Sequence, residues 1–268
     1  MFKDITIGQY FPADTAVHRL DPRFKITLMF FFIISLFFIN SFSPYILIVL
    51  WLILVIKKSE IPMDMMIRGI KPLKWIIIIT VIMNIFFIPG EVIFEYSFIS
   101  ITKEGVRQAI FMAIRLVLLV LGTSLLTLTT SPIELTEGIE KLLSPLKKIG
   151  FPAHAIAMMM TIALRFIPTL IEEADKIMKA QMARGADFES GNLLSRAKNL
   201  VPLMVPLFIN ALRRADDLAN AMEARCYRGE GNRTRLNELV ITNTDRKIFI
   251  INTIFFVLVC ATRFIPLP

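Results

Sequence analysis

A stretch of 31 residues without a charged side chain, residues 26–56, constrains the fold of this chain more than any other feature. As one straight helix it would be about 46 Å long, which exceeds the ~30 Å hydrocarbon core of a bilayer. The segment Asn40-Ser41-Phe42-Ser43-Pro44 interrupts the stretch, and Pro44 suits the first turn of a helix. The sequence therefore predicts a tight hairpin of two membrane spans, near residues 24–41 and 44–61.

Three further spans are predicted in the rest of the chain. The third begins around Pro72-Leu73-Lys74-Trp75 and ends at Pro89-Gly90, the fourth covers about 106–130, and the last covers about 247–264. Residues 92–102, rich in β-branched and aromatic side chains, predict a short extended loop outside the membrane. With 55% hydrophobic residues and no visible signal-peptide pattern, the chain is predicted to be an all-α polytopic membrane protein with about five transmembrane helices.

The segment between the fourth and last spans has a different character. Its charged residues are dense, and its apolar residues recur at helical rather than continuous spacing. Ser131-Pro132-Ile133-Glu134 is typical of a helix start. We predict a large coupling-helix domain at 131–246, preceded by a region of about four spans at 1–130 and followed by the last span and C-terminus at 247–268. Six prolines are expected to cut this domain into pieces: Pro132, Pro145, Pro152, Pro168, Pro202 and Pro206.

Two apolar stretches of this domain, near 149–171 and 200–212, raise the question of additional spans. The uninterrupted apolar core of the first stretch lies between His154 and Arg165 and is about half the length that a span needs. A central Arg would also cost ~2.5–3.5 kcal/mol on insertion scales. We therefore favour helices that lie against the membrane or a partner. If both stretches did span the membrane, the helix ends of this domain would remain on the same side of it.

The basic residues predict the orientation in the membrane. Of the 30 Lys and Arg residues, 26 fall in residues 1–25, 57–74 and 131–247. The two intervening loops hold only Lys103 and Arg107. The positive-inside rule then places the N-terminus and the coupling domain in the cytoplasm and the C-terminus outside.

The sequence lacks the motifs of several enzyme and cofactor sites. It contains no G-x-x-x-x-G-K-[ST], G-x-G-x-x-G, H-E-x-x-H or G-x-S-x-G pattern. Its two histidines, His18 and His154, lie far apart, which argues against a metal or catalytic-histidine site. Arg115 is the one ionisable residue well inside a span and is expected to snorkel or to pair with a helix terminus. The spans are thus expected to be structural, with energy supplied by a partner. Cys226 and Cys260 are expected at different membrane levels, as free thiols.

The main functional signal is a pair of matching helix ends, Ala183-Arg184-Gly185 and Ala224-Arg225-Cys226, whose arginines lie 41 positions apart. Residues upstream match at the same offset: Ala174 with Ala215, Asp175 with Asp216, and Ala180 with Ala221. A single end of this kind would be explained without a partner: Gly can stop the helix, and Arg can complement the helix dipole or contact lipid phosphate. Two matched ends predict more: thin helix tips whose guanidinium groups bind carboxylates in two equivalent grooves of a dimeric partner.

Methionines and prolines in the same domain allow two interpretations each. The methionines either pack in an ordinary core or form an adaptable binding surface. They are Met158, Met159, Met160, Met178, Met182, Met204 and Met222. The prolines at 152, 168, 202 and 206 either break helices or let them slide and rotate.

Several motifs together resemble a known family. They are the two helix ends, the opening Gly8-Gln9-Tyr10 with His18-Arg19-Leu20-Asp21-Pro22-Arg23, the segment Ile101-Thr102-Lys103-Glu104-Gly105, and Met222-Glu223-Ala224-Arg225-Cys226-Tyr227-Arg228-Gly229. Over essentially its whole length the chain resembles the transmembrane T component of energy-coupling factor (ECF) transporters.

The resemblance implies a non-catalytic coupling subunit in a prokaryotic plasma membrane. It would bridge two ABC-type ATPases, which bind the ATP, to a small membrane-embedded S component that binds a vitamin or similar micronutrient. No cofactor is expected in this chain, and no nucleic acid as a partner. The differing third residues, Gly185 and Cys226, predict two non-identical ATPases and put the Gly-type helix stop in doubt at Cys226.

Individual residues take roles from the same resemblance. Arg184 would enter a groove on one ATPase and Arg225 a groove on the other, with Tyr227, Arg228 and Gly229 supporting the second end. Contacts to the S component are expected from Met158, Met159, Met160, Pro168, Met204 and Pro206.

Two alternatives remain. One is a conventional ATPase-driven permease with its own substrate path. The other is a lipid-modifying enzyme that binds phosphate through Arg184 and Arg225. Such an enzyme needs clustered carboxylates, whereas Asp216-Asp217 is a lone pair and Glu172-Glu173 has no obvious partner. The sequence does not reveal the transported vitamin, or whether one or several S components are served.

Overall fold

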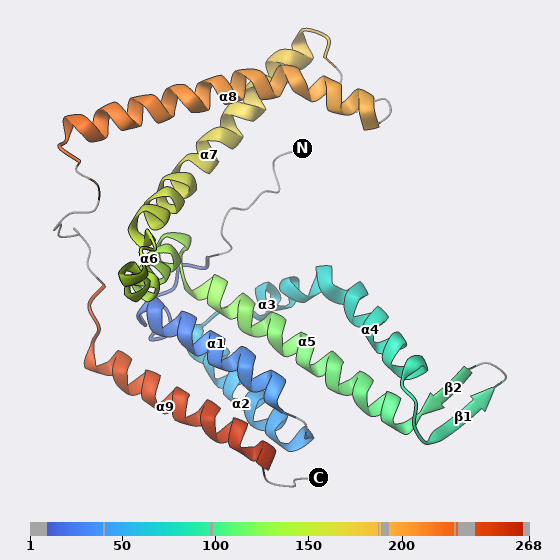
Figure 1. Cartoon of the computed structure of the whole chain (residues 1–268). Helices are drawn as coiled ribbons and strands as arrows, with labels where there is room; N and C mark the ends of the chain where they lie inside the picture. The colour runs from blue at the N-terminus through green and yellow to red at the C-terminus, as the bar shows by residue number, and fades with distance from the viewer. Residues whose placement is uncertain are drawn as a thin grey trace. The chain divides into compact units, whose positions relative to one another are not determined.

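A computed structural model describes residues 10–39, 41–96, 99–186, 188, 193–227, 229 and 239–264 of the chain (Figure 1). The chain divides into two compact units. We call Gly8–Ile139 with Leu239–Pro268 the bundle unit, and Met1–Ile7 with Glu140–Glu238 the crossed-helix unit. Each unit is helical, apart from one small two-stranded sheet in the bundle unit.

The bundle unit opens with the predicted helical hairpin, α1 (Pro22–Phe38) and α2 (Phe42–Ser59). Pro44 lies buried in the first turn of α2, as expected for a residue with a fixed φ and no N–H to satisfy. The other elements of the unit are α3 (Met63–Ile70), the 3-10 helix η1 (Lys71–Leu73), α4 (Lys74–Phe87), β1 (Val92–Tyr96), β2 (Ile99–Thr102), α5 (Lys103–Thr129), the greater part of α6 (Pro132–Leu143), α9 (Asn243–Ala261) and η3 (Thr262–Phe264).

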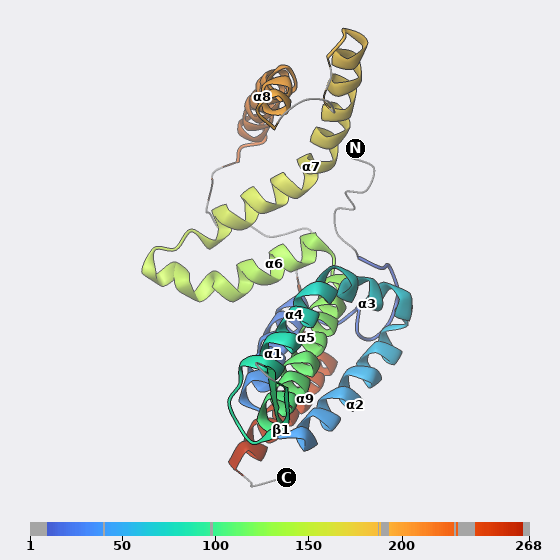
Figure 2. The ribbon, with the colours of Figure 1, turned by 90° about the vertical axis from the view of Figure 1, so that its right-hand side faces the viewer.

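The structure adds two details to the predicted third span and its loop. The long helix α4 starts at Lys74, as predicted for the segment Pro72–Trp75, and α3 and η1 extend the helical stretch back to Met63. Residues 92–102 are extended as predicted, and they also pair as an antiparallel hairpin, seen face-on in Figure 1 and nearly edge-on in Figure 2. In this pairing Tyr96 lies opposite Ile99.

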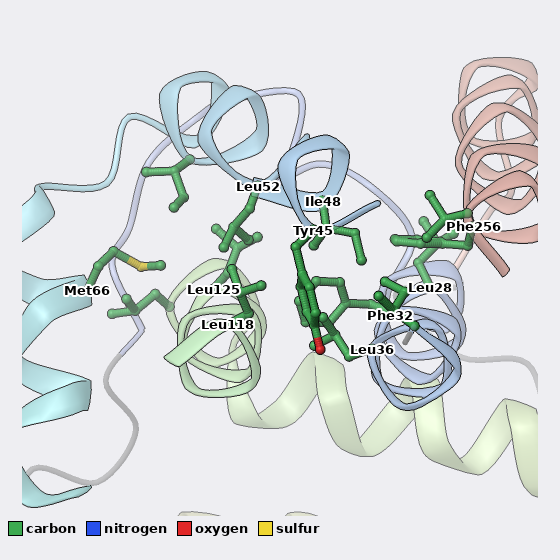
Figure 3. Packing of buried hydrophobic residues seen from close by; sticks show 14 of the residues in the cluster. Leu28, Phe32, Leu36, Tyr45, Ile48, Leu52, Met66, Leu118, Leu125 and Phe256 are labelled. Carbon is green, nitrogen blue, oxygen red and sulfur yellow. The ribbon is translucent and has the colours of Figure 1, made fainter. Parts of the chain in front are cut away.

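The core of the bundle unit lies between α1, α2, α5 and α9 (Figure 3). Phe32 of α1 and Trp51 of α2 stack, and Phe256 of α9 meets both rings edge-on, with ring centroids 5.0–6.1 Å apart. Gly122 of α5 makes room for this cluster, since a Cβ there would lie 2.4 Å from the Phe32 ring. Arg115 of α5 donates to the Ile39 carbonyl at the end of α1 and to the Tyr45 hydroxyl, both at 3.2 Å. The expectation that Arg115 pairs with a helix terminus is therefore confirmed.

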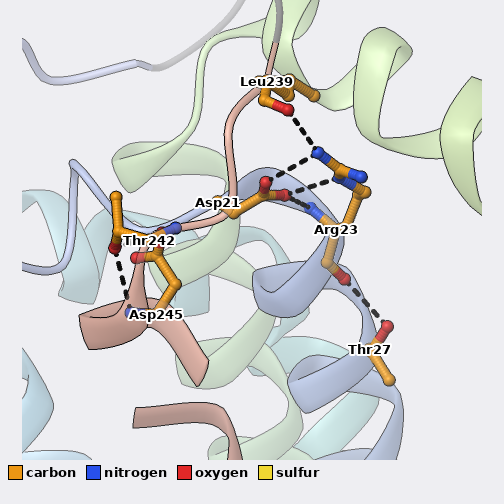
Figure 4. Close-up of polar contacts among 6 residues, drawn as sticks. All are labelled: Asp21, Arg23, Thr27, Leu239, Thr242 and Asp245. Carbon is orange, nitrogen blue, oxygen red and sulfur yellow. Dashed lines mark hydrogen bonds and ion pairs between the residues drawn. The ribbon is translucent and has the colours of Figure 1, made fainter. Parts of the chain in front are cut away.

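The opening motif closes one end of the bundle unit (Figure 4). Asp21 caps α1 through the backbone N–H of Arg23, and Arg23 donates to the Leu239 carbonyl at 2.7 Å. Leu239 is the first described residue after the crossed-helix unit, and Thr242 with Asp245 forms a capping box at the start of α9. The residues around Asp21 thus hold the returning chain against the start of α1.

Four helical stretches are long and apolar enough to cross a membrane: Phe42–Ser59, Met63–Phe87, Lys103–Thr129 and Ala153–Ala183. Helix α1 is shorter, with 17 residues, and α9 carries the charged residues Asp245, Arg246 and Lys247 in its first two turns. The chain is a helical polytopic membrane protein. Ala153–Ala183 qualifies because the helix continues through Arg165 and Pro168, well beyond the apolar core considered in the sequence analysis.

The crossed-helix unit consists of the end of α6, the 3-10 helix η2 (Ser144–Ile149), α7 (Ala153–Ala183) and α8 (Leu193–Ala224). The prediction that prolines cut this region was wrong for three of them, since Pro168 lies inside α7 and Pro202 and Pro206 lie inside α8. A proline inside a helix removes one backbone hydrogen bond but need not end the helix when neighbouring contacts hold it. The others do mark boundaries: Pro132 starts α6, Pro145 starts η2 and Pro152 caps α7.

Candidate functional site at two arginine helix ends

Helix α7 ends in a Schellman motif centred on the first arginine. The Ala186 N–H donates to the Gln181 carbonyl at 3.0 Å, and the Gly185 N–H donates to the Met182 carbonyl at 2.9 Å. Gly185 has φ +89°, the left-handed conformation that glycine adopts without strain. Arg184 is therefore the last residue before the chain turns away from the helix axis.

Helix α8 ends in the same motif. The Tyr227 N–H donates to the Met222 carbonyl at 3.0 Å, and the Cys226 N–H donates to the Glu223 carbonyl at 2.8 Å. Cys226 takes the left-handed conformation with φ +57°. The sequence left in doubt whether the helix could stop at Cys226 without a glycine. The helix does stop there, because the same backbone hydrogen bonds form with Cys in the place of Gly, at a strain cost of about 1 kcal/mol.

Both arginines lie at exposed helix ends. Arg184 and Arg225 are exposed, as are the flanking Ala183 and Ala224. Each stands at a helix C-terminus, where the backbone carbonyls favour a cation. Within the described ranges neither guanidinium forms an ion pair. Of the residues predicted to support the second end, Tyr227 and Gly229 are described, whereas Arg228 lies outside the described residues.

An ion pair joins the two halves of the repeat where α7 and α8 cross (Figure 1). Arg214 of α8 donates to Glu173 of α7 at 3.0 Å, and the two residues are themselves 41 positions apart. Asn210 donates to the other oxygen of the same carboxylate at 2.5 Å. The expectation that Glu173 has no obvious partner was wrong.

The contacts on either side show that the two helices run antiparallel. Met178 packs with Leu203, whereas Met158 contacts Tyr227. In an antiparallel pair, contact between equivalent residues places an approximate two-fold axis at that contact. The axis here passes between Glu173 and Arg214. It therefore relates α7 to α8, the two helices that carry the sequence repeat.

The two arginine ends consequently lie on opposite sides of the crossing. Arg184 follows Glu173 by 11 positions, as Arg225 follows Arg214. At 1.5 Å per residue, each end lies about 16 Å along its helix from the axis. The arrangement presents two separate, equivalent cations.

The spaces beside the crossing are not equivalent. On one side, which we call the closed side, Met178, Phe188 and Leu203 form a buried apolar cluster. On the other side lies an open groove of about 300 Å³. Its lining residues are Ile162, Arg165, Phe166, Leu218, Ala221, Met222 and Arg225. The hydroxyl of Tyr227 and the sulfur of Met158 lie 3.0 Å apart between the same two helix segments.

The methionines divide between the two interpretations. Met178 is buried, as core packing predicts, but Met159 is 61% and Met204 58% exposed, and Met160 is also exposed. Met158 and Pro206 are half-buried, and Pro168 is exposed. Within the apolar stretch 200–212, helix α8 carries an exposed apolar stripe at helical spacing: Val201, Met204, Val205, Phe208 and Leu212.

A metal-binding cluster is absent from the part of the chain that the structure describes. There, no three His, Cys, Asp or Glu residues come together as a metal site would require. His154 instead contacts Glu140 at 3.0 Å. The described surface of the crossed-helix unit carries an exposed arginine at each of two helix ends, an apolar stripe and a groove.

Comparison with known proteins gives a consistent result. The family model described as cobalt transport protein, CbiQ, matches residues 13–236. The energy-coupling factor transporter transmembrane protein EcfT of Clostridium kluyveri is 57% identical over 262 residues, covering 97% of this chain and 96% of that protein. The EcfT protein of Thermosediminibacter oceani is 56% identical over 263 residues, 98% and 99% of the two chains. The EcfT protein of Bacillus subtilis is 47% identical over 251 residues, 93% and 95% of the two chains.

Proposed function

This chain belongs to the CbiQ family of energy-coupling factor transporter transmembrane proteins, and from that premise we propose that its two arginine ends dock on two ATPase subunits. It is a non-catalytic, multi-pass membrane subunit, the T component of an ECF transporter. In our proposal the crossed-helix unit receives the movement of the ATPases and passes it to a membrane-embedded S component that binds a vitamin or similar micronutrient.

The observation that carries the proposal is the symmetry of the helix ends. Arg184 and Arg225 follow the same Schellman geometry at the same distance from the Glu173–Arg214 pair. Two equivalent ends call for two equivalent grooves, and a pseudo-symmetric ATPase dimer supplies them. Each guanidinium fork fits a carboxylate in such a groove. Because Gly185 and Cys226 differ, the two ATPases are proposed to be related but not identical.

The exposed apolar residues of the same helices are proposed to hold the S component. Met204, Pro206 and Phe208 line one stretch of α8, and Met159, Met160 and Pro168 lie on α7. Phe208 is 65% exposed, a large apolar side chain that water does not favour. Methionine adapts to different partners, which suits a surface that serves more than one S component.

The membrane arrangement follows from the helices and the basic residues. We propose five spans, namely α1, α2, the continuous α3–α4 stretch, α5 and α9, with the N-terminus in the cytoplasm. The crossed-helix unit is then cytoplasmic, and α7 and α8 lie against the membrane or the S component. Its dense Lys and Arg residues support this side of the membrane.

Charge reversal tests the docking of the two ends. Arg184→Glu and Arg225→Glu are made singly and together, with Lys176→Glu on α7 as a matched exposed control. The double variant is expected to lose co-purification with the ATPases and vitamin uptake, the single variants to lose part of both, and the control neither. An assembled, active double variant would show that the arginine ends are not the docking elements.

Exchanging the residues that follow the two arginines tests the proposed heterodimer. The variant Gly185→Cys with Cys226→Gly should assemble with altered preference between the two ATPases. Unchanged preference would contradict the assignment of one end to each subunit.

A further inference from the structure

The open groove and the closed side of the crossed-helix unit are counterparts in the repeat. Shifting each groove residue by 41 positions converts Ile162 to Leu203 and Leu218 to Ile177. Leu203 belongs to the buried cluster of the closed side, and the partly buried Ile177 packs against that cluster. The same pair of positions therefore lines both spaces, one filled and one open.

The chain's own Phe188 fills the closed side. It follows Arg184 by four positions, is 8% exposed, and packs with Met178 and Leu203. The chain thus turns back after the first arginine and places an aromatic ring between α7 and α8.

The second arginine end has no such residue to place in its groove. The position equivalent to Phe188 is Gly229, and residues 228–238 contain no aromatic residue. Tyr227 is engaged with Met158, and it is not among the groove residues. The segment that follows the second arginine therefore has no aromatic side chain that could occupy this groove as Phe188 occupies the closed side.

The groove also differs from its counterpart in charge. Both Arg165 and Arg225 line it, whereas Pro206 occupies the position equivalent to Arg165. Two cations beside an apolar wall favour an occupant with an apolar body and a carboxylate. A volume of about 300 Å³ stands at the lower limit of small-molecule sites, which favours a protein side chain.

We infer that the ATPase docked at Arg225 inserts an aromatic side chain, flanked by an Asp or Glu, into this open groove. The inference rests on the proposed docking function and adds the chemistry of the partner at one of the two ends. At the Arg184 end, Phe188 occupies the equivalent space, so the other ATPase contacts only the exposed tip. The two ATPases therefore contact the two arginine ends differently, although the backbones of these ends match: one inserts a side chain beside Arg225, and the other contacts only the tip at Arg184.

Filling the groove from within the chain tests the inference. Ala221→Phe adds a ring to the groove wall, and Ala219→Phe adds the same ring to an exposed position of α8 outside it. Both are made in the Arg184→Glu background, so that assembly depends on the second end. Ala221→Phe is expected to weaken co-purification with the ATPases at least tenfold and Ala219→Phe less than twofold, with equal thermal unfolding temperatures. Equal assembly of the two variants would overturn the inference.

Crosslinking identifies the occupant. The photoreactive variant Leu218→p-benzoylphenylalanine, in the assembled complex, is expected to crosslink to an ATPase peptide with an aromatic residue beside an Asp or Glu. A crosslink only to phospholipid or to the S component would overturn the inference. Arg165→Gln should weaken the second-end complex several-fold, and less so in high salt; no change would overturn the carboxylate assignment.

The outcomes separate this inference from the docking function itself. If the double variant of Arg184 and Arg225 still assembles, docking through the arginine ends is wrong, and the inference falls with it. If the double variant fails to assemble while Ala221→Phe behaves as Ala219→Phe, docking stands and only the groove assignment is wrong.

Discussion

Glu173 and Arg214 occupy the same position in the two halves of a repeat and bind each other at 3.0 Å where α7 and α8 cross. The Glu173 side chain is 17% exposed and that of Arg214 38%, so the pair is partly shielded from water. Asn210 completes the coordination of the carboxylate. The crossing of two long helices is thus fastened by polar groups next to the apolar cluster of the closed side.

The equivalence of these positions makes a charge exchange informative. Glu173→Ala is expected to destabilise the crossed-helix unit by about 1 kcal/mol, a modest value because Arg214 keeps contact with solvent. The exchanged pair Glu173→Arg with Arg214→Glu should recover most of the loss, since the approximate two-fold axis returns each charge to equivalent surroundings. Thermal unfolding in detergent measures both, with the exposed neighbour Glu172→Ala as control. An exchanged pair no more stable than either single reversal would argue against the axis.

The left-handed residues at the helix ends predict opposite effects of two substitutions. Cys226→Gly should stabilise the chain by about 1 kcal/mol, because glycine adopts φ +57° without steric strain. Gly185→Ala should destabilise it by a similar amount, although a Cβ there would meet no neighbouring atom. Ala183→Gly, within the helix, should destabilise through lost helix propensity. Unfolding temperatures check the three signs, and a destabilised Cys226→Gly variant would contradict the backbone geometry.

Replacing each terminal arginine by lysine separates charge from shape. Arg184→Lys and Arg225→Lys keep the cation but lose the planar fork that binds a carboxylate through two hydrogen bonds. Affinity for the ATPases is expected to fall roughly tenfold for each variant. Lys176→Arg, an exposed exchange in the other direction, should leave it unchanged. Full affinity of both lysine variants would mean that net charge alone is recognised.

His18 makes the bundle unit sensitive to acid. Burial, together with the positive charge of Lys25, lowers the pKa of His18 below its usual value. In the neutral ring Nε2–H donates to the Phe11 carbonyl at 3.1 Å, and Nδ1 accepts from the Thr15 hydroxyl at 2.7 Å. The unfolded chain binds this proton more readily, so stability is complete above about pH 6.5 and declines as the pH falls toward the lowered pKa.

Unfolding temperatures between pH 7 and pH 5 test this dependence. His18→Gln should flatten the decline relative to the unsubstituted chain. Arg19→Gln, at the exposed neighbouring position, should leave the decline in place. A slope unaffected by His18→Gln would assign the acid sensitivity to other groups.

Local signals predicted much of the bundle unit. The charge-free run with Pro44 gave the α1–α2 hairpin, the β-branched residues gave the extended segment, and the position of Arg115 gave its bond to a helix terminus. Those features depend on neighbours in sequence or on the cost of burying charge. The length of α7 was not predicted, because a proline such as Pro168 usually ends a helix, whereas α7 continues despite the missing backbone hydrogen bond.

Only part of the candidate functional site could be predicted from the sequence, because the rest depends on contacts between distant residues. The arginine ends can be recognised in the sequence because they are repeated. Glu173 and Phe188 could not be recognised, because their contacts with α8 are not predicted by any local pattern. One signal was available: opposite charges at the repeat offset of 41 positions, as in Glu173 and Arg214, match an antiparallel pair with a two-fold axis. The two sides of the crossing differ in Phe188, which has Gly229 as its equivalent, and in Arg165, which has Pro206.

The equal spacing of both arginines from the crossing has a mechanical consequence. The two helices extend from the Glu173–Arg214 contact to their arginine ends with arms of the same length. With arms of about 16 Å, a rotation of 10° about that contact would displace each end by about 3 Å. Forces of equal size on the two ends would therefore exert equal torques about the crossing.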